Sequence, residues 1–209
     1  MTTAPARPRA ARPRAARPSA ARQRILDTAF RLFYAHGIRT VGVDRIIAES
    51  GVAKATFYKH FPAKDDLVVA YLDTVDGIWT QQLRDAAEAA GPAPADRLVG
   101  MFDALGSACR RDGYRGCAFI NAAAENEAGT PIHDRTLAHK TAVLDWVRGL
   151  AADASAADPD LLARSLTLLL DGGLASGSLD GLPDAPAAAK EAARVLVSLA
   201  TDQKWTDRC

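Results

Sequence analysis

A short run of hydrogen-bonding side chains at helical spacing lies in the first third of the chain. At about 100° per residue, Lys54, Ala55, Tyr58 and Lys59 share one arc, and Phe57 points away from its middle. Lysine suits guanine O6 and N7 or a phosphate, and tyrosine and threonine suit phosphate oxygens. The pattern predicts a helix with an outward face for DNA. A solvated face over an ordinary core is the alternative, and it would be the better interpretation of an isolated lysine.

The elements that must position this face are two short helices joined by a tight turn. The stretch Val43–Lys64 reads VDRIIAESGVAKATFYKHFPAK, with apolar residues at helical spacing in its first half. Gly51 tolerates the left-handed backbone at a helix C-terminus. A second helix is expected at Lys54–His60, and Pro62 prevents it from continuing. This layout is typical of a helix-turn-helix, whose second helix lies in the major groove.

Side chains on the other sides of the second helix have different expected roles. Thr56 and His60 lie on a flank, one turn apart, beside the predicted DNA face. Phe57 can enter the core together with Val52 and Phe61. The pair of helices therefore has both an apolar anchor and a polar outer face.

The stretch GVAKATFYKHF from Gly51, followed by Lys64, resembles the signature of the TetR/AcrR family of transcriptional regulators. The resemblance extends over roughly residues 21–75 and beyond that is one of helical layout. By position it implies contacts near the bases for Lys54, Ala55 and Tyr58. It implies backbone or flank contacts for Thr56, Lys59 and His60, and phosphate binding by Lys64.

The chain departs from the family pattern at two places. Gly42 and Val43 stand where many members carry a phosphate-binding threonine, and Arg45 is the expected substitute for that contact. Ala53 stands where a serine N-cap is usual, which costs about 1 kcal/mol of local helix stability.

Composition predicts an all-α protein in a reducing compartment. Nearly half of the 209 residues are hydrophobic, alanine-rich helical patterns dominate, and few stretches alternate with period two. No 18-residue apolar span and no apolar signal region occur, so neither a membrane helix nor secretion is expected. The three cysteines, Cys109, Cys117 and Cys209, form no metal-binding motif. A cytoplasmic location fits this pattern best.

The net charge of +1 conceals a strong asymmetry along the chain. Residues 1–64 hold 13 lysines and arginines against three acidic residues, a net charge of +10, and residues 65–209 carry a net charge of −9. A basic first third on an acidic remainder is typical of a DNA-binding head on a body that does not bind DNA.

Three regions are expected. Residues 1–20 form a basic tail of Arg, Pro and Ala that cannot pack a core. Three interpretations of the tail remain open: an arm that contacts DNA, a leader that keeps the chain in solution, or a start codon assigned too far upstream of the real domain. Residues 21–66 are the three-helix DNA-binding domain, and residues 67–203 are a helical effector-binding and dimerisation domain. About nine helices are predicted, including Ala21–His36, a long fourth helix after Pro62 to about Ala89, and a single fifth helix over Ala95–Arg111.

The resemblance also implies an effector pocket enclosed by the fourth to eighth helices and a homodimer formed by the last two. Aromatic residues with a polar anchor are the expected pocket lining: Trp79, Phe102, Phe119, Asn121 and Trp146. The dimer interface is expected to use Leu166, Leu169, Leu170 and Leu196. Gly172 and Gly173 either weaken the eighth helix or let another backbone approach closely.

Other chemistry is weakly represented. Glu125, Glu127, His133, Asp134 and His139 resemble metal ligands in type, but the two histidines lie six residues apart and do not share a helix face, which favours a solvated surface. No catalytic or phosphate-binding motif occurs, so no cofactor or metal is expected. Cys117 is interpreted as a buried structural cysteine, with a redox sensor at a helix start as the alternative.

The sequence thus predicts an all-α, two-domain regulator that is a homodimer on a palindromic DNA operator. A repressor released by a small-molecule effector is the main hypothesis. The alternatives are an activator, an effector-independent regulator, or a helical enzyme whose DNA-binding head is vestigial and whose acidic and histidine cluster is catalytic.

Overall fold

The computed structural model describes residues 19–179 and 184–202. These residues form ten helices and no strand, which confirms the all-α prediction. The helices are α1 Ala20–His36, α2 Val43–Ser50, α3 Lys54–His60, α4 Lys64–Ala89, α5 Pro94–Gly100, α6 Phe102–Cys109, α7 Ala118–Glu125, α8 Pro131–Asp153, α9 Pro159–Ser176 and α10 Ala185–Thr201. Most of the predicted tail and the last residues, 203–209, lie outside the described residues.

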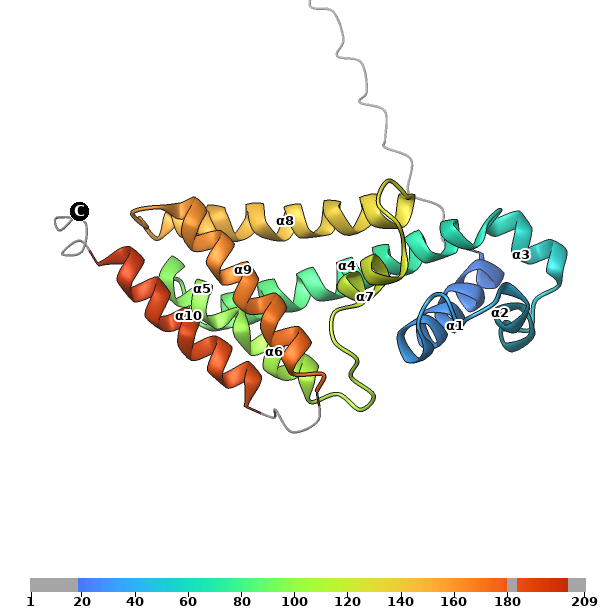
Figure 1. Cartoon of the computed structure of the whole chain (residues 1–209), viewed down its shortest axis with the longest axis horizontal. Coiled ribbons are helices and arrows are strands. Elements are labelled where there is room, and N and C mark those ends of the chain that lie inside the picture. Colours follow the sequence, from blue (N-terminus) through green and yellow to red (C-terminus); the bar gives the residue numbers. More distant parts are fainter. Residues whose placement is uncertain (1–18, 180–183, 203–209) are drawn as a thin grey trace, which may run out of the picture.

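Helices α1–α3, with the turns between them (residues 19–63), form one end of the molecule, which we call the head (Figure 1). Helices α4–α10 form the body. Ser19 begins the head, and its hydroxyl caps α1 by accepting a hydrogen bond from the Arg22 amide at 3.2 Å. Both α2 and α3 contact α1, so the helix-turn-helix pair rests on a third helix.

Helix α4 begins directly after the last turn of the head and crosses the body beside α8 (Figure 1). Its 26 residues span about 39 Å at 1.5 Å per residue. Asp66 stabilises the first turn, because its carboxylate accepts a hydrogen bond from the Ala63 amide at 2.9 Å. Leu67 and Leu72 are buried towards the start of the helix and Leu83 near its end. The same helix therefore contributes to the core at both ends of the molecule.

The prediction of a single helix over residues 95–111 is wrong, because the helix is interrupted at Met101. There the Ala104 amide bonds to the Met101 carbonyl, an i to i+3 bond that tightens the turn. Gly100 precedes the break and lies against the end of α4, where a Cβ atom would come within 2.3 Å of the Ala90 Cβ. This close approach requires glycine.

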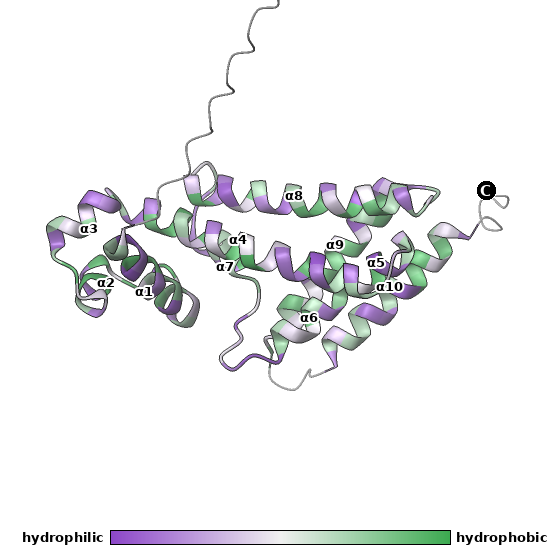
Figure 2. Ribbon diagram, turned by 180° about the vertical axis from the view of Figure 1, so that it is seen from behind, coloured by the Kyte–Doolittle hydropathy of each residue, from purple (hydrophilic) through white to green (hydrophobic). Residues whose placement is uncertain are grey.

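Helices α9 and α10 lie side by side at the end of the body away from the head (Figure 1). The paired glycines of α9 do not interrupt the helix. Gly173 instead permits close packing, since a Cβ atom there would lie 2.5 Å from Leu105 Cδ2 and 3.3 Å from Ala189 Cβ. Hydrophobic and hydrophilic residues alternate along the helices, and the loop between α6 and α7 is largely hydrophilic (Figure 2).

Candidate nucleic-acid interface and ligand cavity

The turn between α2 and α3 has the geometry that the sequence suggests. Gly51 adopts φ 65° and ψ 30°, the left-handed conformation, at the C-terminus of α2. Phe57 is fully buried, and Phe61 packs beside it with 6.2 Å between ring centroids. Neither Gly42 nor Ala53 offers a side chain that caps the helix it precedes. Tertiary anchoring by the two phenylalanines therefore fixes α3.

The outer face of α3 is open to solvent. Lys54, Ala55 and Lys59 are exposed, and 44% of the Tyr58 surface is accessible. Lys54 Nζ lies 3.6 Å from Asp44 Oδ1, an ion pair whose members are both exposed and which therefore costs little to break. Thr56 is half-buried on the flank. The structure thus brings the predicted base-facing residues together on one free surface.

Two other predicted DNA contacts, His60 and Arg45, already have partners within the chain. His60 Nε2 lies 3.1 Å from the hydroxyl of Ser19 at the start of the described head. Arg45 donates to Glu49 at 2.9 Å, and Arg31 binds the second oxygen of the same carboxylate. Hydrogen bonds from Arg31 and Arg45 lower the pKa of Glu49.

Lys64 points towards the turn between α1 and α2. Its ammonium donates to the Ile38 carbonyl at 2.6 Å and lies 6.0 Å from the centroid of the Phe33 ring. Partial burial lowers the pKa of Lys64, and the nearby carboxylates of Asp65 and Glu125 oppose that effect. In this arrangement Lys64 joins α4 to the head.

A cavity of about 210 Å³ lies where the head meets the body. Its wall combines α1, α4, α6, the α6–α7 loop, α7 and α9. It is largely aromatic and aliphatic: Phe30, Tyr34, Val75, Ile78, Trp79, Gln82, Ala108, Arg111, Asp112, Tyr114, Gly116, Cys117, Ala118, Phe119 and Leu174. Two of the five predicted pocket residues, Trp79 and Phe119, line it together.

The other predicted pocket residues lie elsewhere. Phe102 is buried in the core. Trp146 lies beneath the Arg84 guanidinium, 5.8 Å from its ring. Asn121 donates to the Arg115 carbonyl at 2.9 Å and lines a neighbouring polar cavity of about 220 Å³. Sequence reasoning missed Phe30 and Tyr34 as cavity residues. Helical periodicity places them on a helix, but their position in the cavity depends on how α1 packs against the body.

A partly buried polar cluster lies behind the Phe119 wall of the cavity. The His139 ring stacks on Phe119, with centroids 3.7 Å apart and planes inclined by 5°. His139 Nδ1 lies 2.6 Å from Asp76 Oδ1, and Arg135 binds the second oxygen of that carboxylate at 2.7 Å. His139 is 2% exposed, so the prediction of a solvated surface is wrong for this residue. Its position on α8 faces α4 and α7.

The packing of this cluster shifts the pKa values of His139 and Asp76. Burial lowers the pKa of His139 in spite of the adjacent Asp76 carboxylate. Burial alone would raise the pKa of Asp76, but hydrogen bonds from His139 and Arg135 outweigh it and lower the pKa. Neutral His139 therefore donates its Nδ1 proton to ionised Asp76.

Cys117 N-caps α7 by position and is buried in the cavity wall. Lys140 Nζ lies 3.9 Å from its sulfur and also binds Asp171. Across residues 19–179 and 184–202, no three His, Cys, Asp or Glu residues are grouped as metal ligands. None of the described helices is both long and apolar enough to cross a membrane.

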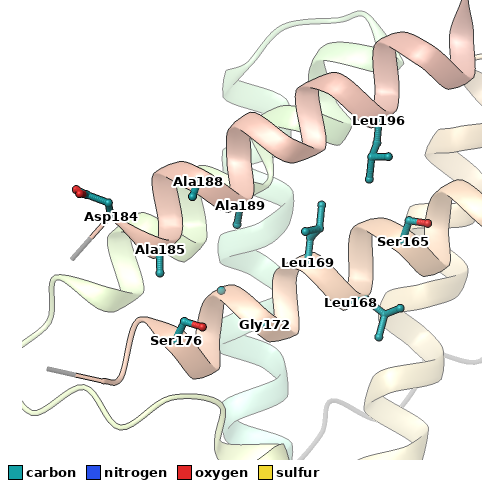
Figure 3. A pocket seen from close by; sticks show the side chains of 11 residues that line it. Ser165, Leu168, Leu169, Gly172, Ser176, Asp184, Ala185, Ala188, Ala189 and Leu196 are labelled. Atoms are coloured by element: carbon teal, nitrogen blue, oxygen red, sulfur yellow. The ribbon is translucent and has the colours of Figure 1, made fainter. Parts of the chain in front are cut away.

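An open groove of about 840 Å³ separates the outer sides of α9 and α10 (Figure 3). Leu169 and Leu196 face each other across it, and Leu168 is 73% exposed. Leu166 and Leu170 instead point into the core of their own chain and are almost fully buried. Their side chains are therefore not available to a second copy, whereas Leu169 and Leu196 are.

A three-helix head with an exposed polar face on α3, joined to a helical body with a cavity at the junction, is the architecture of a helix-turn-helix transcriptional regulator. The family model described as bacterial regulatory proteins, tetR family, matches residues 25–71. The structure is similar to that of SCO4454, a TetR-family transcriptional regulator from Streptomyces coelicolor, at 38% identity over 87% of this chain and 96% of that one, with a TM-score of 0.81. The chain belongs to the TetR family and is a DNA-binding transcriptional regulator.

Two further similarities are more distant. The regulatory protein TetR from Rhodobacter sphaeroides shares the fold, with a TM-score of 0.74 at 24% identity over 85% of this chain and 99% of that one. The HTH-type transcriptional regulator YjdC from Escherichia coli (strain K12) is 24% identical over 153 residues, which cover 71% of this chain and 78% of that protein.

Proposed function

We propose that the protein is a homodimeric repressor that reads a palindromic operator through α3 and leaves it when a small molecule enters the cavity. The observation that carries the DNA-reading part is the division of α3 into two sides. Phe57 fixes the helix from within, while Lys54, Tyr58 and Lys59 remain exposed without strong partners. The matching family is bacterial, and a bacterial protein that acts on chromosomal DNA works in the cytoplasm.

In this proposal Lys54, Ala55 and Tyr58 approach base edges in the major groove, and Thr56, Lys59 and His60 bind the sugar-phosphate backbone. Arg45 and Lys64 would contact phosphates after exchanging Glu49 and the Ile38 carbonyl for DNA oxygens. That exchange is inexpensive for Arg45, whose side chain is 44% exposed. It costs more for Lys64, which is partly buried.

The groove between α9 and α10 is the proposed contact with the second copy. The exposed Leu168 and the half-buried Leu169 and Leu196 line it, and an unpaired apolar surface of this kind is typical of an interface. Leu168, Leu169 and Leu196 carry the contact, and Leu166 and Leu170 support it from beneath. A twofold dimer would place two α3 helices on two half-sites.

The cavity wall supports a small aromatic effector. A cavity of about 150 Å³ lined by apolar side chains holds benzene, so about 210 Å³ suits a compound of one or two rings. Five of the lining residues are aromatic, which favours a flat molecule. Trp79 and Gln82 offer polar groups to a substituent of the ligand.

The test joins DNA selection to ligand screening. Duplexes are selected from a random pool by the wild-type chain, and one- and two-ring aromatic compounds are screened by thermal shift. A compound that raises the melting temperature should release the selected duplex, and Trp79→Ala should weaken both effects. Trp146→Ala is the matched control, because that tryptophan lies outside the cavity.

A different experimental result would contradict each part of the proposal. If no compound of this class both binds and releases DNA, the effector part fails and an effector-independent regulator remains. A promoter with the selected duplex across its start site then separates repressor from activator, since a repressor must lower transcription there.

A further inference from the structure

The turn between α1 and α2 is held by a carboxylate from the body. Glu125, the last residue of α7, accepts a hydrogen bond from the Arg39 amide at 2.6 Å across 86 residues of sequence. Gly37 permits this approach. Its φ of 86° is left-handed, and a Cβ atom there would lie only 3.0 Å from Glu125 Oε1. The turn is therefore shaped to receive the carboxylate.

Other charged side chains complete the same junction. The last carbonyls of an α-helix have no partner within the helix. The Arg115 guanidinium from the α6–α7 loop donates to the Ala35 carbonyl, and Lys64 donates to Ile38. Residues outside the head thus satisfy the backbone at the end of α1. Glu125 alone among these three accepts from a backbone amide of the turn.

Helix α7 also reaches the cavity with its opposite end. Ala118 and Phe119 in its first turn line the cavity, and Tyr34 of α1 lies on the same wall. The Tyr34 hydroxyl donates to the Gly116 carbonyl at 3.3 Å and accepts from the Arg115 amide at 3.1 Å. A helix of eight residues therefore connects the cavity wall to the α1–α2 turn at the head end of the body (Figure 1).

We propose that Glu125 is a positioning residue for DNA binding. Its carboxylate fixes the Arg39 amide, and α2 begins four residues later at Val43. A displacement of the turn moves α2 and with it α3, so Glu125 sets the angle at which the reading helix meets the half-site. This inference rests on the proposed role of α3 as the helix that reads DNA.

The experiment compares substitutions at Glu125 with the same substitutions at Glu127, an exposed residue two positions further along. The probe is the duplex that the wild-type chain selects from a random pool. Operator affinity is measured on that duplex and on a series whose half-site spacing is lengthened or shortened by single base pairs. The free protein suffices, so no effector is needed.

Glu125→Ala should weaken binding about tenfold, as expected for loss of a hydrogen bond to a charged acceptor, and should change the preferred spacing. Glu125→Gln retains an acceptor oxygen and should retain the wild-type spacing with a smaller loss of affinity. Glu127→Ala and Glu127→Gln should match the wild type. A residue that only stabilises the fold would lower affinity on every spacing equally.

Wild-type affinity and spacing preference in Glu125→Ala overturn the inference, as does a uniform loss on all spacings. If Glu125→Ala does not fold by circular dichroism, Glu125→Asp replaces it. That variant keeps the charge but draws the carboxylate back by one methylene, so a changed spacing preference is expected and an unchanged one overturns the inference. A wild-type chain that selects no duplex would instead contradict the DNA-reading proposal on which the inference rests.

Discussion

The head and the body arrange their functional side chains in different ways. In the head, the exposed face that we propose reads DNA, called here the reading face, lies within the seven residues of α3. Where the head meets the body, the cavity wall is assembled from segments as far apart in sequence as Phe30 and Leu174. The reading face follows from local helical periodicity, and the cavity follows only from the way in which helices meet. A short motif therefore identifies the head, whereas tertiary structure is needed to find the cavity.

The two regions also differ in how much their candidate functional residues contribute to the packing of the fold. The outer side chains of α3 pack against little, because the anchoring is done by Phe57 and Phe61 on the opposite side. In the body, Phe119 both lines the cavity and stacks on buried His139. Substitutions on the reading face should change DNA binding alone, while substitutions in the cavity wall should also change stability.

The largest effect is expected where the head is anchored. Phe57→Ala removes a fully buried ring and should lower the free energy of unfolding by about 3–5 kcal/mol. Denaturant unfolding measures it, with Lys54→Ala as a surface control that should stay within about 0.5 kcal/mol of the wild type. Equal stability of Phe57→Ala and wild type would show that α3 is not anchored by this ring.

Disruption of the proposed dimer contact comes next. Leu169→Glu or Leu196→Glu introduces a charge into the apolar groove and should give monomers that lose operator binding, because two heads must act together. Light scattering measures the mass. Leu137→Glu, on the exposed side of α8, is the control. Dimers that survive both groove substitutions would place the interface elsewhere.

Substitutions on the reading face should have smaller and purely functional effects. Tyr58→Ala or Lys54→Ala should each cost about 1–3 kcal/mol of operator binding, with helicity and dimerisation intact. Titration of the selected duplex by fluorescence anisotropy measures the loss. If both variants bind as the wild type does, another surface reads the DNA.

The smallest expected effect concerns pH and the polar cluster of the body. Because the pKa of His139 is lower in the folded chain, the unfolded state takes up its proton first. This contribution to stability is complete above the unfolded pKa of about 6.5 and is lost as pH falls towards the folded value. His139→Gln should flatten the pH dependence of unfolding in that window. An unchanged profile would mean that other groups titrate there.

Elements that are determined by local sequence could be predicted, and elements that depend on contacts distant in sequence could not. The bounds of α3 and the burial of Phe57 could be predicted, since glycine, proline and apolar spacing determine them within about twenty residues. The break at Met101 could not, because it arises where Gly100 meets the end of α4. Burial of His139 was also missed, since its partner Asp76 lies 63 residues away on another helix.

Site residues show the same division. Lys54, Ala55 and Tyr58 share an exposed face, as their spacing indicates, although their contacts with DNA stay a prediction. Trp79 and Phe119 meet in the cavity, but Phe102 and Trp146 carry the same sequence signal and lie elsewhere. Aromatic residues on apolar helix faces are equally suited to core and cavity. The two kinds of position can be told apart only from the packing of the helices, here that of α1 against the body.

The central claim is that the cavity between head and body and the reading face of α3 are thermodynamically coupled. Calorimetric titration of a cavity-binding aromatic compound, with and without the selected duplex, tests it most directly. Coupling is reciprocal and typically about 5–150-fold in affinity, so we predict that the duplex weakens ligand binding by the factor by which the ligand weakens DNA binding. Equal ligand affinities in the two titrations would contradict the account and leave a DNA-binding protein without a switch.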